Sequence, residues 1–223
     1  MYFHECDILT AINKLKSNFT LGPDGFPPIF FKQLKHVIAL PLTLIYNQLM
    51  SVAYVPDTWK MAVITPVFKK GVITDCCNYR PISVTCVTSK IFERVVSRYI
   101  HENLLCNDIL HPSQHGFLKG HSTCTSLLES LNDWTLALQD RHGVVIVYVD
   151  FSKAFDVVSH NKLFARLHSY GIQGNLLLWL RNFFSGRSHC TKVGNNLSDF
   201  LELISGVVQG MCCWAVNVFD VYK

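Results

Sequence analysis

The chain has 223 residues, of which 49% are hydrophobic and 16% charged, a globular composition that excludes a disordered or low-complexity protein. The net charge of +4 permits a polyanionic partner without requiring one. Nine cysteines include two adjacent pairs but no Cys-x-x-Cys, so neither a zinc site nor a disulfide framework is indicated. Because the N-terminus does not resemble a signal peptide and no apolar run reaches membrane-spanning length, we expect an intracellular protein.

The first third of the chain predicts helix, turn and helix. Apolar residues at helical spacing predict a short helix over residues 8–15. Two glycines and three prolines make residues 21–28 a turn-rich loop. Pro28 suits the first turn of a following helix, whose apolar pattern is interrupted at Pro41 and predicts a kink or a division into two helices.

A β-hairpin is predicted next. Residues 59–70 contain a strand expected to end at Pro66 and two lysines, and residues 78–84 contain a second strand after a turn. The hairpin would present three basic side chains, Lys69, Lys70 and Arg80. These side chains suit phosphate binding, but lysines on surface strands also serve to block edge pairing, and this alternative stays open for the two lysines.

Two helices flank a polar loop in the middle of the chain. Residues 89–105 predict an amphipathic helix, with Glu93 and basic residues on a solvated face. Residues 114–123 predict a loop whose two histidines, His115 and His121, we interpret as polar loop residues because no third metal ligand is nearby. A second helix should begin near Ser122 or Thr123 and face the core through Leu127, Leu128, Leu131, Trp134 and Leu138.

The stretch with the strongest chemical signal is residues 144–150. Six apolar residues, mostly β-branched, end at Asp150, a pattern typical of a strand buried on both faces. A carboxylate at the end of a buried strand can hold a metal ion rigidly. Asp is also a favoured N-cap, and spacing alone supports capping and catalysis equally.

The last third of the chain predicts two helices and two strands. Glycines are expected to end both helices, because glycine favours the left-handed conformation that follows a helix. The elements are helices over residues 161–170 and 174–184, ended by Gly171 and Gly186, and strands over residues 187–193 and 200–204 around a polar turn.

Several stretches resemble one family. Val-Asp-Phe-Ser-Lys-Ala-Phe-Asp at residues 149–156 resembles the first catalytic motif of reverse transcriptases from non-LTR (LINE-like) retrotransposons. The resemblance extends from about residue 21 to residue 210 with the family's landmarks in order. They are Gly-Pro-Asp-Gly at 22–25, Asn-Tyr-Arg-Pro-Ile-Ser at 78–83, Gln-His-Gly-Phe-Leu-Lys-Gly-His-Ser-Thr at 114–123 and Ser-Gly-Val-Val-Gln-Gly at 205–210.

This resemblance implies an α+β right-hand polymerase with fingers, a partial palm and no thumb. Residues 144–149 would be a central palm strand. The implied division is an N-terminal helix at 1–20, fingers at 21–110, palm at 111–158, a second fingers segment at 159–199, palm again at 200–210 and a divergent tail at 211–223.

The resemblance also implies a two-metal nucleotidyl transfer with Mg²⁺ as cofactor. Asp150 and the Phe151 carbonyl would be metal ligands, and Asp156 would lie outside the metal pair. Phe155 would be a steric gate against ribose, with core packing as an alternative or additional role. Arg80, with Lys69 and Lys70, would bind the triphosphate, and Gln209 and Gly210 would contact the nucleotide or template. The partners would be an RNA template, a DNA primer and deoxynucleotides, with no membrane and no small-molecule cofactor.

One part of the family's site is absent from these 223 residues. The family carries Tyr/Phe-Ala-Asp-Asp after the Gln-Gly motif, but the sequence has no adjacent Asp pair, and Asp220 stands alone. The match also fails after Gly210, which leads us to expect a truncated, frameshifted or spliced copy. Two hypotheses follow: the polymerase domain of a LINE-like element in an inactive copy, or a non-catalytic nucleic-acid-binding remnant or pseudogene product.

Overall fold

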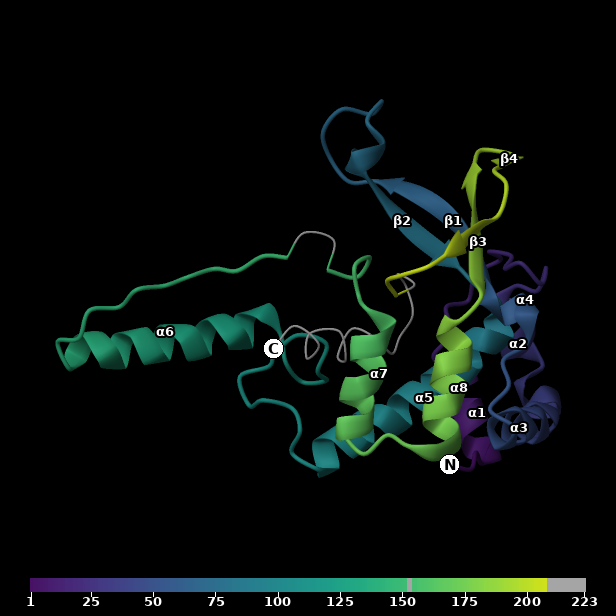
Figure 1. Ribbon diagram of the computed structural model, residues 1–223, viewed down its shortest axis with the longest axis horizontal. Helices are drawn as coiled ribbons and strands as arrows, with labels where there is room; N and C mark the ends of the chain where they lie inside the picture. Colours follow the sequence, from purple (N-terminus) through teal and green to yellow (C-terminus); the bar gives the residue numbers. More distant parts are fainter. Residues whose placement is uncertain (152–153, 208–223) are drawn as a thin grey trace.

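The computed structural model describes residues 1–151 and 154–207 and has the mixed α+β character expected from the sequence. Figure 1 shows three parts: a body of packed helices, a sheet that rises from it, and an arm formed by helix α6 and the extended chain that follows. None of the helices in the described part of the chain combines the length and apolarity needed to cross a bilayer.

The helical body confirms most of the predicted helices. Helix α1 packs on α3 and α5, while α8 packs on α3 and α7. Positive φ angles of 81° at Gly171 and 60° at Gly186 follow α7 and α8, as predicted. The described helices of the body are α1 (Glu5–Asn13), α2 (Pro28–Gln33), α3 (Lys35–Ser51), α4 (Asp57–Lys60), α5 (Val87–Cys106), α7 (His160–Ser169) and α8 (Gly174–Phe184).

An aromatic cluster around Phe92 of α5 forms the centre of this body. Its ring is stacked on Trp179 of α8 with the ring centroids 4.7 Å apart, and it meets Tyr46 of α3 edge to face at 4.8 Å. The rings of Phe3 and Trp59 also contact Phe92, with centroid distances of 5.1 and 5.7 Å. Aromatic rings bury large apolar areas, so this cluster joins five separate segments into one core.

The sheet has the order β2-β1-β3-β4, with β5 also paired to β3. The predicted hairpin is confirmed by the antiparallel pairing of β1 and β2, and β1 also runs parallel to β3. The strands are β1 (Met61–Phe68), β2 (Tyr79–Val84), β3 (Arg187–Val193), β4 (Asn196–Leu197) and β5 (Leu201–Leu203), and a 3₁₀ turn, η1 (Cys76–Asn78), precedes β2.

Two expectations about prolines, a division into two helices at Pro41 and a strand end at Pro66, were wrong, while a kink at Pro41 stays a prediction. The helix division lies at Leu34, between α2 and α3, and Pro41 is inside α3. Strand β1 continues through Pro66, which lies opposite Pro81 of β2. The N–H of Lys69 donates to the carbonyl of Asn78 at 2.8 Å, so these two residues form a hydrogen-bonded pair. Hydrogen-bonded and non-hydrogen-bonded pairs alternate along an antiparallel ladder, and Pro66 and Pro81, three pairs further along, therefore form a non-hydrogen-bonded pair. Neither proline therefore removes a ladder hydrogen bond.

The prediction for the solvated face of α5 was wrong at Glu93, which is 2% exposed. Its carboxylate accepts a hydrogen bond from the Ser89 hydroxyl at 2.6 Å. Burial raises the pKa of Glu93 to about 7, although Ser89 and the positive charge of Arg187 act in the opposite direction. Arg187, itself buried, donates to the carbonyls of Phe183 at 3.0 Å and Trp59 at 3.3 Å. These contacts fix the start of β3 against the helical body.

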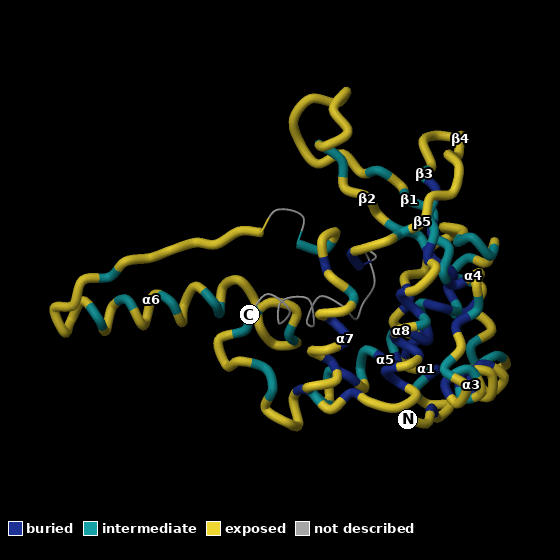
Figure 2. The backbone as a smooth tube through the Cα atoms, viewed as in Figure 1, coloured by how far each residue is buried: buried dark blue, intermediate teal, exposed yellow. Residues whose placement is uncertain are grey.

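The largest difference from the predictions concerns residues 144–149. They form no strand in the structure, and Val145 and Val147 are 91% and 78% exposed. Helix α6 (Thr123–Gln139) begins after the predicted cap Ser122, but Leu128 on its expected inner face is 61% exposed. Figure 2 shows most of the arm in the colour of exposed residues. A buried strand needs partners on both sides, and no strand of residues 1–151 and 154–207 pairs with this run.

Candidate nucleotide and nucleic-acid site

Two stretches far apart in the sequence meet after the run that ends at Asp150. The N–H of Val207 donates to the carbonyl of Phe155 at 2.8 Å, and the N–H of Gly206 donates to that of Val158 at 3.1 Å. The Ser205 hydroxyl donates to the Asp156 carbonyl at 3.3 Å. We call these contacts between residues 155–158 and 205–207 the backbone clamp. The backbone clamp joins the segment that follows Asp150 to the segment that precedes Gln209.

The clamp is tight enough to require glycine at position 206. Gly206 has a φ of 82°, and a Cβ placed there would lie 2.7 Å from the Asp156 carbonyl oxygen. The His160 Nε2 contacts the Gly206 carbonyl at 2.8 Å, an arrangement in which the ring nitrogen carries the proton. Sequence reasoning did not assign a role to His160, Ser205 or Gly206, because each contact depends on a partner about fifty residues away.

Phe155 lies half-buried and packs against the hydrophobic core. The core-packing role that we considered for it is therefore confirmed, while its role as a steric gate stays a prediction. Gln209 and Gly210, the predicted nucleotide or template contacts, lie outside the described residues.

Asp150 and Phe151 are both exposed. The capping alternative for Asp150 finds no support from the next described helix, because α7 has Ser159 as its N-cap. Within residues 1–151 and 154–207, Asp150 belongs to no group of three potential metal ligands whose donor atoms lie within 4.8 Å of one another. A magnesium ion needs several hard oxygen ligands, so the described residues do not assemble the expected Mg²⁺ site.

The basic residues of the hairpin are exposed, as predicted. Arg80 lies opposite Val67 in the register, and Lys69 continues the ladder through its hydrogen bond to Asn78. Because side chains alternate along a strand, Val67, Lys69 and Arg80 share one face of the hairpin. Lys70 comes next, where the ladder has ended. The structure thus separates Lys69 from Lys70, which sequence reasoning treated as a pair.

A second basic surface is a groove of about 680 Å³ along the outer side of α5. Arg94 donates from Nη1 to the Lys14 carbonyl at 3.0 Å, and its Nε is buried without a hydrogen-bond partner among the described residues. Phe117, 57% exposed, also lines the groove. The basic residues that line this basic groove are Lys14, Arg94, Arg98, His101, Lys119 and His121, and Glu102 is an acidic residue of its lining.

Arg98 is partly neutralised within the groove. It forms a hydrogen-bonded ion pair with Asp7 of α1, and its Nε lies 3.8 Å from the Glu102 carboxylate. Burial acts to raise the pKa of Asp7, but the His4 N–H, which donates to its carboxylate, and then the Arg98 guanidinium hold that pKa below its usual value. The cations left for a ligand are therefore chiefly those of Lys14, Arg94 and Lys119.

The two loop histidines lie together at the start of α6. Their ring centroids are 4.9 Å apart, and the Nδ1 atoms of His115 and His121 are separated by 3.3 Å. His115 also contacts the Thr125 hydroxyl at 2.9 Å and the Glu129 carboxylate. The contact with His115 lowers the pKa of Glu129. These bonds attach the loop to the first turns of the helix.

Comparison with known proteins gives a consistent result. Residues 67–215 match the family described as "Reverse transcriptase (RNA-dependent DNA polymerase)". The chain is 29% identical over 211 residues to the "Probable RNA-directed DNA polymerase from transposon BS" of Drosophila melanogaster, covering 92% of this chain and 22% of that protein.

Two further relatives come from the same organism. The chain is 26% identical to the "Probable RNA-directed DNA polymerase from transposon X-element", with 93% of this chain and 23% of that protein covered. It is 30% identical to the "RNA-directed DNA polymerase from mobile element jockey", with 76% and 18% covered. The chain thus spans about a fifth of the length of these relatives.

Proposed function

The chain belongs to the reverse transcriptase (RNA-dependent DNA polymerase) family of non-LTR retrotransposons, and we propose that it contributes the fingers and part of the palm of such a polymerase. In this proposal residues 21–110 and 159–199 are the fingers, and residues 111–158 and 200–210 belong to the palm. The substrates are an RNA template, a DNA primer and deoxynucleotides.

The observation that carries this proposal is the backbone clamp. It joins residues 155–158, at and just after the end of the motif at 149–156, to residues 205–207, the start of the motif at 205–210, through three hydrogen bonds between residues far apart in the sequence. A nucleotide site built from both motifs requires such proximity, because metal, sugar and base contacts must converge within one nucleotide's length. Phe155 then lies beside the chain that leads to Gln209.

The basic surfaces support nucleic acid as the partner. The face of the hairpin that carries Lys69 and Arg80 suits a triphosphate, because the Arg guanidinium binds phosphate oxygens through a planar fork of donors. The basic groove combines cations with an exposed aromatic ring, the combination with which proteins bind single-stranded nucleic acid.

The second candidate function is nucleic-acid binding without catalysis. It is favoured by one specific observation, the exposed Asp150 without a group of neighbouring ligands among the described residues. The family uses divalent metal ions, and two such ions held close together repel strongly unless several carboxylates offset their charge. We assign no metal-dependent step to the described residues.

A single pair of assays distinguishes the two functions. The 223-residue polypeptide is mixed with a DNA primer annealed to an RNA template, and both a mobility shift at low salt and primer extension with Mg²⁺ or Mn²⁺ are measured. We expect a salt-sensitive shift without extension, because phosphate contacts suffice for binding but not for nucleotidyl transfer. If the unchanged chain extends the primer and the Asp150→Asn variant does not, the chain is catalytic and the second candidate is refuted. Absence of any shift would refute both.

The basic groove can be tested in the same binding assay. Lys119→Gln should weaken binding and reduce the slope of log affinity against log salt by roughly one, the contribution of a single phosphate contact. Lys162→Gln is the matched control, because Lys162 is exposed on α7 and does not line the groove. Equal effects of the two variants would exclude the groove as the binding surface.

A further inference from the structure

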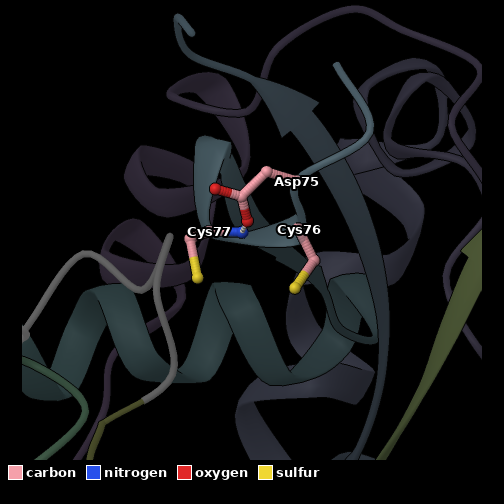
Figure 3. Close-up of side chains that lie close together, drawn as sticks. All are labelled: Asp75, Cys76 and Cys77. Carbon is pink, nitrogen blue, oxygen red and sulfur yellow. Dashed lines mark hydrogen bonds between the residues drawn. The ribbon is translucent and has the colours of Figure 1, made fainter. Parts of the chain in front are cut away.

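The tip of the fingers hairpin holds a cluster that the polymerase proposal does not use. Asp75, Cys76 and Cys77 each offer a ligand atom, and these atoms lie within 4.8 Å of one another. Figure 3 shows the two sulfur atoms on the same side of the turn, with the carboxylate of Asp75 close to Cys77. No other such group of three occurs in residues 1–151 and 154–207. We propose that these three residues bind one thiophilic divalent cation of the Zn²⁺ type, with water completing its coordination.

The turn that carries the three donors is held in place by the protein itself. The Asp75 carboxylate accepts a hydrogen bond from the Cys77 N–H at 2.9 Å, which holds it beside the two cysteines. The Asn78 side chain donates to the Val72 carbonyl at 3.0 Å, and the Tyr79 hydroxyl donates to the Ile73 carbonyl at 2.9 Å. The ligands are therefore arranged before the cation arrives, which lowers the cost of binding.

The donor set and its dimensions suit zinc. Zn²⁺ prefers thiolate sulfur at about 2.3 Å in tetrahedral geometry, which places two sulfurs roughly 3.8 Å apart. Atoms already within 4.8 Å of one another reach that separation through small side-chain rotations. Three protein ligands and one water make an open, exchangeable site rather than the closed four-ligand site of a zinc finger. The exposure of all three residues leaves the cation free access.

The electrostatics of the cluster also favour a cation. The Asp75 carboxylate and the ionised thiols of Cys76 and Cys77 would gather three negative charges in one turn. A divalent cation offsets their mutual repulsion when it binds the three groups. The balanced reaction is one Zn²⁺ plus two thiols and one carboxylate, giving the complex and two released protons. The bound cation would close the loop between β1 and β2, beside the ladder that positions Lys69 and Arg80.

The test uses the full 223-residue chain in a non-thiol reductant, with Zn²⁺ competed against a coloured chelator and Cd²⁺ as a spectroscopic probe. We expect one cation per chain, thiolate-to-Cd²⁺ charge-transfer absorption and release of two protons per Zn²⁺. Cys76→Ser with Cys77→Ser should remove the absorption and the binding. Asp75→Asn should weaken binding while the absorption remains.

The chain offers a matched control in its second adjacent cysteine pair. The double variant Cys212→Ser and Cys213→Ser should keep the stoichiometry, the absorption and the affinity of the unchanged protein. Binding that survives loss of Cys76 and Cys77, or that disappears with Cys212 and Cys213, would overturn the assignment. The assignment would also be overturned if the protein bound no Zn²⁺ although a thiol titration showed that both Cys76 and Cys77 were reduced.

Discussion

The N–H of Val207 donates a hydrogen bond to the carbonyl of Phe155 at 2.8 Å, and it thereby connects the motif that ends the described chain to the motif around Asp150. Neither residue carries a charge or a reactive group. Their contact places Phe155 close to the stretch that leads to Gln209. The proposed nucleotide site therefore depends on backbone hydrogen bonds as much as on the side chains that would touch a substrate.

Replacing Gly206 by alanine should open the backbone clamp. The added Cβ would lie 2.7 Å from the Asp156 carbonyl oxygen, and the φ of 82° disfavours any side chain, so we expect a loss of about 1–3 kcal/mol in unfolding free energy. Urea denaturation measures the loss, and proteolysis near residue 157 reports the local opening.

Gly194→Ala provides the control for this substitution. Gly194 also has a positive φ, 59°, but nothing lies within 4 Å of a Cβ built there. It should lose only the conformational contribution of about 1 kcal/mol and leave the proteolysis pattern unchanged. If both variants behave alike, the close contact with Asp156 has no energetic role.

The buried Glu93 should make stability depend on pH. Burial raises its pKa from 4.5 to about 7, against the attraction of Arg187, Lys90 and Arg94, so the folded state binds a proton that the unfolded state has lost. The contribution of Glu93 to the unfolding free energy is therefore greatest below pH 4.5, falls as the pH rises, and levels off above pH 7. From the size of the shift we expect a decrease of about 1–3 kcal/mol.

Comparison with Glu93→Gln isolates this contribution. The amide remains neutral, so the variant should lack this decrease between pH 5 and 8 and exceed the unchanged protein in stability at pH 8. Glu102→Gln is the control on the same helix, because Glu102 is exposed and lies 3.8 Å from Arg98. It should retain the full pH dependence. Unfolding curves of Glu93→Gln that follow the unchanged protein at every pH would contradict the assignment.

Local patterns predicted much of the helical body. Helix α8 was predicted with its observed bounds, because leucines at helical spacing and a following glycine leave few alternatives. The hairpin of β1 and β2 was predicted from its turn and strand signals. Pro66 was misjudged because its effect depends on pairing: facing Pro81 in a non-hydrogen-bonded pair, it costs no hydrogen bond.

Features that depend on distant partners could not be predicted in this way. Glu93 looks like a surface residue in its own helix, and distant segments place it in the interior: Trp59 packs on the adjacent Phe92, and the buried Arg187 acts on the Glu93 carboxylate. The clamp at Gly206 requires knowledge of where Asp156 lies. The apolar, β-branched run at residues 144–149 indicates a preference for a buried strand, but it does not show whether partner strands are present.

The two lysines of the hairpin should differ in nucleotide binding. Lys69 shares a face with Arg80, whereas Lys70 lies beyond the end of the ladder. We therefore expect Arg80→Gln and Lys69→Gln to weaken binding of a deoxynucleoside triphosphate, measured by fluorescence titration, more than Lys70→Gln does. Equal losses for both lysines would indicate nonspecific attraction by the hairpin's charge, and no loss for Arg80→Gln would remove Arg80 from the phosphate site.

Residues 145–149 are exposed in the structure, whereas the sequence predicts that residues 144–149 form a buried palm strand. A substitution in this run distinguishes the two. In the structure Val147 is 78% exposed, so Val147→Lys should change the unfolding free energy of the 223-residue chain by no more than about 0.5 kcal/mol. A charge at this position should also reduce aggregation, because exposed β-branched runs pair readily with other chains. Urea denaturation and light scattering measure the two effects.

Val96→Lys is the matched control, because Val96 of α5 is 1% exposed in the helical body. An unpaired charge buried there should cost more than about 3 kcal/mol or prevent folding. If Val147→Lys is as destabilising as Val96→Lys, then residues 144–149 are buried in a palm sheet in solution, as the apolar pattern predicts. If Val147→Lys is neutral in this chain, the strand remains unpaired and Asp150 stays exposed. The substitution thus tests directly whether the first motif is held in the position that catalysis would require.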